Sequence, residues 1–368
     1  MDATSFVIPI TPTCKMIART YTGDELDAWQ EWFEKLDDAS PYHSPTYLDL
    51  LTGDFEYETE QPELFVYGEK DAFIYYPYIR RPLSDLSFSD EVVKRPSEYA
   101  DIVSSWYYGG PVLSPGGDES LAAEFVDEFA EYCKDTNILA EFIRFDPNLR
   151  NHDDFARLDP TYNRQTVPVD LSRSKDAIWN DYESRNRRAI KQARESALTI
   201  DREPTETDTG KFHDIYSNAM EARDASEHYR FTEGFFEDIL DTPLFSLVVA
   251  RYDGVVVGGF IIAHDSTYSH HYLSASNPDY WEYRVNNLMY HEVVMCMHET
   301  GRKVFDFQGG RPGVFKFKKG FSPSRGEFHI GKRTHVPDVY ERLVDAAEAA
   351  GIETDSGYFP AYRVEQSN

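Results

Sequence analysis

The stretch from Leu244 to His264 reads LFSLVVARYDGVVVGGFIIAH. Two apolar runs flank the polar turn RYDG at Arg251–Gly254, and this arrangement is typical of a β-hairpin. The residues that follow predict a strand at 268–275, a helix over 286–300 that ends at Gly301, and a short buried strand at 304–307. The second half of the chain is therefore expected to form a β-sheet covered by helices.

The first half predicts the same kinds of element. It contains an apolar helical stripe in 24–36, a turn and short helix in 41–51, two strands in 63–79, a strand leading into a loop in 106–115, a helix in 118–135 and a strand in 140–145. For the second half we also expect a strand at 165–171, one long basic helix over 174–196, helices at 211–225 and 232–240, and a last strand that begins at 315–317. The shared order of elements suits a weak internal duplication of the chain.

These elements predict an α/β fold with mixed α+β sheets in two domains. We place an N-terminal domain at 1–163 and a C-terminal domain at 164–330. We expect a C-terminal tail, 331–368, that packs back on the first domain. A chain of 368 residues is long enough to bury two such cores.

The charge balance excludes several classes of function. Against 37 Lys and Arg stand 65 Asp and Glu, which gives a formal net charge of −28. A surface this negative repels polyanions, so passive binding to nucleic acid or to an anionic membrane is disfavoured. The spread of acidic residues fits adaptation to molar salt, where the Debye length is about 3 Å; an ordinary acidic enzyme is the alternative. The 25 Tyr and 24 Phe exclude a disordered chain.

Cysteine usage argues against disulfide and metal frameworks. Cys14, Cys133 and Cys296 lie far apart and form no CxxC pair. The first 13 residues show no secretory signal pattern, and no stretch approaches the roughly 18 apolar residues that span a bilayer. We therefore expect a cytoplasmic protein without a bound metal.

The basic segment Ser184–Ala193 stands out against the acidic background. Five basic residues lie between Arg185 and Arg194, and Arg185, Arg188 and Gln192 recur at helical spacing. Guanidinium groups suit phosphate or carboxylate, so this face is a candidate clamp for an anionic substrate in the cleft between the domains. The alternative is a solvated helix face paired with Glu183 and Glu195, which contributes only tenths of a kcal/mol per pair.

The segment Phe315–Phe321, FKFKKGF, is the second candidate site. If it is extended, Lys316 and Lys318 share one face, because side chains alternate along a strand. A fixed ammonium in a dry cleft can stabilise an oxyanion; otherwise these lysines protect an exposed strand edge. We favour Lys318 as the catalytic residue and place Lys316 in substrate binding.

Asp306 ends the predicted strand VFDF and precedes the turn Gln308–Gly310. Clefts in open α/β sheets form at such strand ends. If burial raised its pKa, the carboxylate could accept the proton of an attacking amine. It could equally cap the turn through its own backbone.

Several motifs, taken in order, resemble the GNAT superfamily of acyltransferases, and in particular its FemAB-like branch, also called BioF2-like. These motifs are YGGPVL at 108–113, SRNRRAIKQA at 184–193, VGGFII at 257–262, Leu288 in the following helix, GRKVFDF at 301–307 and FKKGF at 317–321. The resemblance implies tandem GNAT-like domains packed side by side with a cleft between them. It also implies that an acyl or aminoacyl group is transferred from an activated donor to an amine by direct attack.

The resemblance carries site roles onto particular residues. In the family, the lysine matched by Lys318 is thought to hold the donor terminus or the developing charge. In the peptidoglycan-bridge members, basic residues matched by Arg185 and Arg188 contact the phosphates of a nucleotide-linked acceptor. Tyr108 is expected to line the substrate cleft of the first domain, although Ser114 stands where the peptidoglycan-bridge members often have Asp.

The donor remains open between acyl-CoA and aminoacyl-tRNA as co-substrate. The loop Asn277–Asn287 lacks the glycines with which coenzyme-A-using members approach a pyrophosphate. This departure is normal for FemAB-like proteins, although the charge disfavours tRNA. Arg284 and Asn287 are candidate anion ligands at the start of the following helix. The alternative outside enzymes is a non-catalytic GNAT-like protein that binds a ligand.

Overall fold

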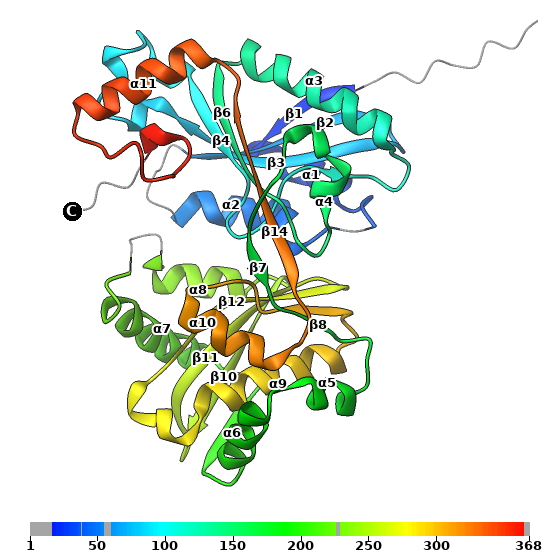
Figure 1. Ribbon diagram of the computed structural model, residues 1–368, viewed down its shortest axis with the longest axis vertical. Helices are drawn as coiled ribbons and strands as arrows, with labels where there is room; N and C mark the ends of the chain where they lie inside the picture. The colour runs from blue at the N-terminus through cyan, green and yellow to red at the C-terminus, as the bar shows by residue number, and fades with distance from the viewer. Residues whose placement is uncertain (1–16, 38, 55–59, 226–228, 364–368) are drawn as a thin grey trace, which may run out of the picture.

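Two mixed β-sheets, each covered by helices, form the two halves of the protein (Figure 1). The computed structural model describes residues 17–37, 39–54, 60–225 and 229–363. Cys14 and the first 13 residues lie outside this range. Cys133 and Cys296 are free thiols. Within the described ranges, no helix has the length and apolarity needed to cross a bilayer.

The first sheet has the strand order β1-β2-β3-β4-β6-β14-β7, and β5 pairs with β3. Its strands are β1 (Ile17–Thr22), β2 (Gln61–Gly68), β3 (Phe73–Pro82), β4 (Ala100–Val103), β5 (Val112–Leu113), β6 (Ile138–Arg144), β7 (Thr161–Thr166) and β14 (Gly326–Thr334). Its helices are α1 (Leu26–Phe33), α2 (Pro45–Asp54), α3 (Glu119–Asp135), α4 (Asn151–Asp154) and α11 (Pro337–Ala349). We call these elements the first unit.

The second sheet has the strand order β8-β13-β12-β11-β10-β9. Its strands are β8 (Pro168–Asp170), β9 (Leu198–Asp201), β10 (Phe245–Tyr252), β11 (Val255–His264), β12 (Tyr268–Ser276) and β13 (Val304–Asp306). Its helices are α5 (Lys175–Asp181), α6 (Ser184–Arg194), α7 (Glu206–Glu221), α8 (Glu233–Leu240), α9 (Val285–Glu299) and α10 (Pro312–Lys318). These elements form the second unit.

The hairpin expected from the opening stretch is confirmed. Tyr252 pairs with Val255, so the connection is the two residues Asp253 and Gly254. Both have positive φ, 47° and 83°, as a type I′ turn requires, and Gly254 adopts this conformation without steric cost. The helix α9 also ends as expected, with Gly301 at φ 83° just beyond its C-cap.

The two units repeat one topology. In the first, β1, α1, α2, β2, β3, β4, α3, β6, α4 and β7 follow in order; in the second, β9, α7, α8, β10, β11, β12, α9, β13, α10 and β14 do so. Corresponding strand pairs have the same direction: β4 and β6 are parallel, as are β12 and β13, and the preceding pairs are antiparallel. The chain is therefore a tandem of two like units.

One strand follows the second unit in the chain but pairs in the first sheet. β14 closes the order of the second unit, yet it pairs with β6 and β7 in the first sheet. It lies beside β7 on the path that joins the two halves (Figure 1). The sequence-based boundary at 330 therefore falls inside β14. The expected strand 165–171 is likewise divided between the sheets, as β7 and β8.

Two element predictions were wrong. The helix expected over 174–196 is broken at Tyr182 and Glu183, whose ψ angles of 141° and 146° are extended, so α5 and α6 are separate. The strand expected to begin at 315–317 is part of α10. Pro312 sits at the first helical position, where its fixed φ favours helix initiation. Lys316 and Lys318 therefore do not share a face.

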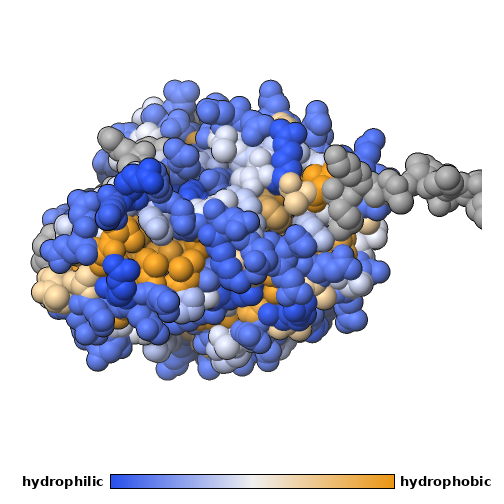
Figure 2. Space-filling view, turned by 90° about the horizontal axis from the view of Figure 1, so that it is seen from above, coloured by the Kyte–Doolittle hydropathy of each residue, from blue (hydrophilic) through white to orange (hydrophobic). Residues whose placement is uncertain are grey.

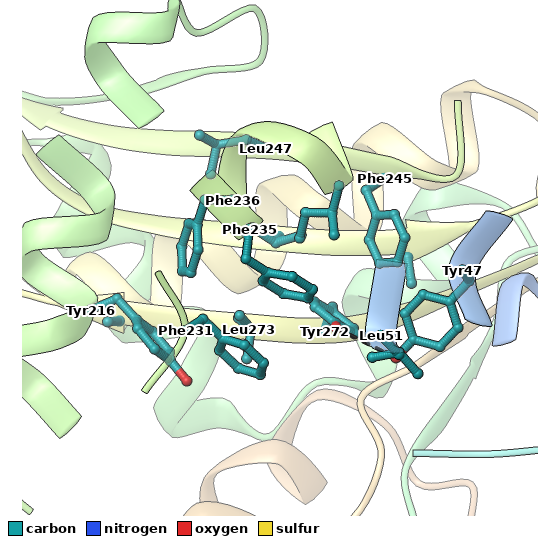
Figure 3. Close-up of a cluster of buried hydrophobic side chains, with 14 of the residues drawn as sticks. Tyr47, Leu51, Tyr216, Phe231, Phe235, Phe236, Phe245, Leu247, Tyr272 and Leu273 are labelled. Carbon is teal, nitrogen blue, oxygen red and sulfur yellow. Dashed lines mark hydrogen bonds between the residues drawn. The ribbon is translucent and has the colours of Figure 1, made fainter. Parts of the chain in front are cut away.

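A shared aromatic core joins the units. Tyr47 and Leu51 of α2 lie beside Phe245 and Tyr272 of the second sheet (Figure 3). The ring centroids of Tyr47 and Phe245 are 5.6 Å apart, and those of Tyr47 and Tyr272 are 6.1 Å apart. Because this cluster draws on both sheets, neither unit buries its apolar surface alone.

Seen from above, the surface of the first unit is mostly hydrophilic, with an apolar patch in it (Figure 2). The segment after β14 packs on this unit, where Leu343 and Ala347 of α11 join a core with Leu83 and Leu139. Few apolar side chains of α11 are therefore left to solvent.

A buried ion-pair network anchors the end of the described chain. Arg81 donates through Nε to Asp101 at 2.7 Å, and Arg363 also pairs with Asp101. Arg363 further donates to the carbonyl oxygens of Arg81 and Pro82 at 3.0 and 2.8 Å. Each oxygen of the buried Asp101 carboxylate therefore has a cationic partner.

We predict that Arg363→Ala lowers the free energy of unfolding by about 3 kcal/mol, because it leaves part of a buried carboxylate unpaired. Urea denaturation at fixed salt measures the change. Arg157→Ala is the control, since the Arg157–Asp127 pair is exposed at the surface and its loss changes stability little. Equal effects of the two substitutions would contradict the anchoring role.

Candidate functional site

A cavity of about 610 Å³ opens on the second unit between α6, the start of α9 and α10. It is lined by Arg185, Asn186, Arg188, Ala189, Gln192, Arg284, Asn287, Gly313, Lys316 and Phe317. Three arginines, one lysine and three amides thus share the lining, with no carboxylate among its described residues. In a chain of charge −28, this concentration of cations indicates an anion site.

Helix geometry places these side chains. α6 buries Asn186, Ile190 and Ala193, which leaves Arg185 and Arg188 on the opposite, exposed face. The break at Glu183 starts α6 beside the cavity, and the left-handed residue Arg284, at φ 63°, starts α9 there as well. The N-terminal ends of both helices add positive potential at the cavity.

A close backbone approach fixes the start of α6 against the turn Lys319–Phe321 that follows α10. The Glu183 N–H donates to the carbonyl of Gly320 at 2.8 Å. A Cβ on Gly320 would lie 2.7 Å from Nδ2 of Asn186, so only glycine allows this contact without a shift. The glycine of the FKKGF motif is therefore a packing residue.

The polar lining is partly internally bonded. Arg185 pairs with Glu183 at 2.7 Å and donates to the carbonyl of Lys316 at 2.8 Å. Arg284 donates to Gln192 at 3.2 Å. The Arg185–Glu183 pair is exposed and holds Arg185 weakly. Among the described residues, no carboxylate lies within ion-pair distance of Arg188, Arg284 or Lys316, so these cations can meet a ligand.

Lys318 follows the lining residue Phe317 but is buried behind the lining. Its side chain is only 4 % exposed, and Nζ donates to the carbonyl of Gly309 at 2.9 Å. Burial lowers the pKa of Lys318 to about 7, although the charge of Asp306 opposes this shift. The ammonium and the free amine are thus both accessible near neutral pH.

Asp306 is fully buried at the end of β13. One oxygen accepts the backbone N–H of Gln308 at 2.8 Å, so the turn-capping role expected as an alternative is present. The other accepts the Tyr108 hydroxyl at 3.0 Å and the Asn148 amide at 3.5 Å. Burial raises the pKa of Asp306, while these hydrogen bonds and Lys318 oppose the shift.

The sequence-predicted site residues fall into two groups. Five line the cavity: Arg185, Arg188, Lys316, Arg284 and Asn287. The other three, Lys318, Asp306 and Tyr108, form a buried polar cluster where the two units meet. The residues expected to bind the substrate and those expected to bind the donor line the same cavity. We expected the basic clamp to face the cleft between the domains, but every lining residue belongs to the second unit.

Some contacts of the predicted site residues could not be predicted from the sequence. Asn148 of the first unit reaches Asp306 across 158 positions, and only the fold brings them together. Tyr108 was expected in a substrate cleft, but it is buried and its hydroxyl serves Asp306. His270 and His271 are both buried, because both faces of the second sheet are covered. The described residues contain no group of ligands that could hold a metal ion.

Comparison with known proteins identifies relatives of this architecture. Residues 181–319 match the family described as Acetyltransferase (GNAT) domain. The crystal structure of FemX superposes with a TM-score of 0.64 at 13 % identity, over 89 % of this chain and 99 % of that one.

Two further structures superpose with a TM-score of 0.53. The C-terminal domain (DUF2156) of a protein from Agrobacterium fabrum, named as a lysylphosphatidylglycerol synthetase, does so at 13 % identity over 88 % and 96 % of the two chains. A protein of unknown function from Bacteroides thetaiotaomicron does so at 11 % identity over 86 % and 99 %. A search of curated protein sequences found no match.

We predict that burial makes Lys318 a pH-dependent cost to stability. Above the pKa of a free lysine, both folded and unfolded chains hold the neutral amine. Between about pH 10 and pH 7, the unfolded chain takes up the proton and the folded one does not, so stability falls as pH falls. Relative to Lys318→Met, the wild type should therefore lose about 1.4 kcal/mol per pH unit across this window.

Urea denaturation at pH 7, 8, 9 and 10 measures this difference. Lys316→Met, at the exposed position two residues earlier, separates the effect of burial from the loss of a lysine charge. A stability difference for Lys318→Met that does not change with pH would contradict the burial of this amine.

Proposed function

The chain is a GNAT-superfamily protein with a tandem, FemX-like fold, and from this we propose that it transfers an acyl group from a phosphate-bearing activated donor to an amine. The observation that carries the proposal is the cavity of about 610 Å³ with four cations in its lining. Its size lies in the range of small-molecule sites, which is roughly 300–1,000 Å³. A phosphate-bearing carrier supplies the negative charge that this lining lacks.

In this proposal the cavity holds the carrier of the acyl group. Arg188, Arg284 and Lys316 bind its phosphates, assisted by Arg185 and by the N-terminal ends of α6 and α9. Asn287 and Gln192 offer amide groups that orient the same ligand. Fixing the donor at several points lowers the entropic barrier of the transfer.

In this proposal the reacting carbonyl reaches Lys318, the buried last residue of α10, from the neighbouring lining residue Phe317. As an ammonium, Lys318 has three donors and gives one to the carbonyl of Gly309, so two remain for a developing oxyanion. In a site without water, this ammonium stabilises a developing oxyanion more strongly than it would in water. Asp306 is the proposed acceptor of the amine proton during direct attack.

Acyl-CoA is the donor that we propose, because coenzyme A carries the phosphates that the cavity suits. The charge of −28 disfavours a large polyanion such as tRNA. An aminoacyl-tRNA donor is the second candidate. It is supported by the absence of glycine between Asn277 and Asn287, where coenzyme-A-using members have a glycine-rich loop. A donor-binding protein without turnover is the third.

We predict that the chain binds acetyl-CoA and that Arg188→Ala and Arg284→Ala each weaken binding about tenfold or more, because each removes a charged hydrogen bond. Isothermal titration calorimetry at two salt concentrations measures this, and binding of the variants should depend less on salt. Lys191→Ala is the matched control, since Lys191 is exposed on α6 outside the cavity.

Turnover is tested with a panel of amines and with acetyl-CoA or aminoacyl-tRNA as donor. Lys318→Ala should abolish most of the turnover and leave donor binding intact. Binding of aminoacyl-tRNA in place of acetyl-CoA would select the second candidate. Donor binding without turnover on any amine would select the third, and binding of neither donor would overturn the proposal.

A further inference from the structure

Two buried aspartates occupy equivalent places in the tandem units. β6 and β13 are corresponding strands, and each carries a Phe-Asp pair at its C-terminal end: Phe145–Asp146 in FDPN comes directly after β6, and Phe305–Asp306 in FDFQ forms the last two residues of β13. Both carboxylates are fully buried. Each uses one oxygen to accept the backbone N–H two residues on, from Asn148 at 2.9 Å and from Gln308 at 2.8 Å. The duplication has thus placed the same carboxylate turn in both units.

The two turns meet at the interface and exchange contacts. Asn148, from the first turn, approaches Asp306 with its amide at 3.5 Å. Gln308, from the second turn, donates its amide to the Tyr42 hydroxyl of the first unit at 3.0 Å. The ring of Tyr42 lies 5.6 Å from that of Tyr108, which donates to Asp306. Each turn therefore reaches into the surroundings of the other.

The environments of the two carboxylates differ in one respect. Asp306 accepts the Tyr108 hydroxyl and lies near the Lys318 ammonium. In Asp146, the second oxygen Oδ2 is buried and accepts no hydrogen bond of ordinary geometry from a described residue, although the nearby Ser40 hydroxyl favours the ionised form. A protonated carboxyl tolerates such a position far better than an ionised one. The geometry thus favours the charge on Asp306 and the proton on Asp146.

We propose that Asp146 and Asp306 share one proton across the unit interface, held on Asp146, so that Asp146 is a positioning residue that keeps Asp306 ionised beside Lys318. This rests on the proposed function for its role in catalysis, since Asp306 must be ionised to accept the proton of an amine. Two like charges in a buried cluster raise each other's pKa, and the pair titrates as a unit.

The tyrosines and histidines around the two aspartates do not change their protonation state near neutral pH. Burial raises the pKa of Tyr42 and Tyr108, which stay protonated, and lowers that of His43 to about 4 and that of His270 to about 3. Burial raises the pKa of Asp146 to about 7 against the hydrogen bonds of Asn148, Ser40 and Leu149, and the charge of Asp306 adds to the rise. On the other side of Lys318, the pKa of His271 is also lowered by burial. Near neutral pH, the charge of the cluster therefore changes only at Asp146, Asp306 and Lys318.

The test is a pH titration of the full chain, carrying ¹³C-labelled aspartate carboxyls, by NMR. In the wild type we expect one aspartate resonance to titrate near pH 7, and we expect it to be absent from Asp146→Asn. In Asp306→Asn, it should move to lower pH, because the neighbouring negative charge is gone. Asp170→Asn, at an exposed position, is the control and should leave this resonance unchanged.

The wild-type titration alone can overturn the inference. If every aspartate resonance titrates below about pH 5.5, no carboxyl in the protein holds a proton at neutral pH, whether or not the variants fold. Persistence of the pH 7 resonance in Asp146→Asn would assign it to another residue and overturn the inference equally.

Activity measurements separate this inference from the proposed function. In Asp146→Asn, the amide is neutral at every pH, so the part of the pH dependence of turnover near pH 7 that comes from Asp146 should be lost, while the part that comes from Lys318 remains and KM is unchanged. An unchanged pH profile would contradict the positioning role. Failure to bind either donor would overturn the proposed function and leave the NMR result standing. If the wild type binds a donor but shows no aspartate resonance that titrates near pH 7, only the shared proton is overturned.

Discussion

Burial of the Lys318 ammonium beside the Asp306 carboxylate is the constraint on which the site depends. Removing both charges from water is costly unless hydrogen bonds and the mutual attraction compensate. The compensation comes from both units: Gly309 accepts from Lys318, while Tyr108 and Asn148 donate to Asp306. The cluster can therefore exist only where the two units are packed against each other.

The exchange of β14 and the shared aromatic core make that packing part of the fold. β14, which follows the elements of the second unit in the chain, completes the first sheet, and Tyr47 of the first unit packs on Phe245 and Tyr272 of the second. The cavity needs only the second unit, whereas the Lys318–Asp306 cluster needs both. Ligand binding and proton handling thus have different structural origins.

The candidate site was predictable in part. Arg185 and Arg188 were identified because a local run of cations contrasts with a charge of −28, and Arg284 because it precedes the start of a predicted helix; all three line one cavity. The four letters FKFK were assigned to a strand, because an alternating run too short to show a helical period cannot distinguish the two structures. Asp146 was missed, because a lone aspartate in a polar loop is an ordinary turn residue.

The sequence by itself determined the hairpin at Asp253–Gly254, the end of α9 at Gly301 and most of the elements in both halves, because turn chemistry and hydrophobic period act over a few residues. Only the tertiary structure decided that β14 crosses to the first sheet, that Lys318 is buried while Lys316 is exposed, and that Asn148 contacts both Asp146 and Asp306. These outcomes depend on which surfaces bury one another, and that depends on contacts between residues distant in the chain.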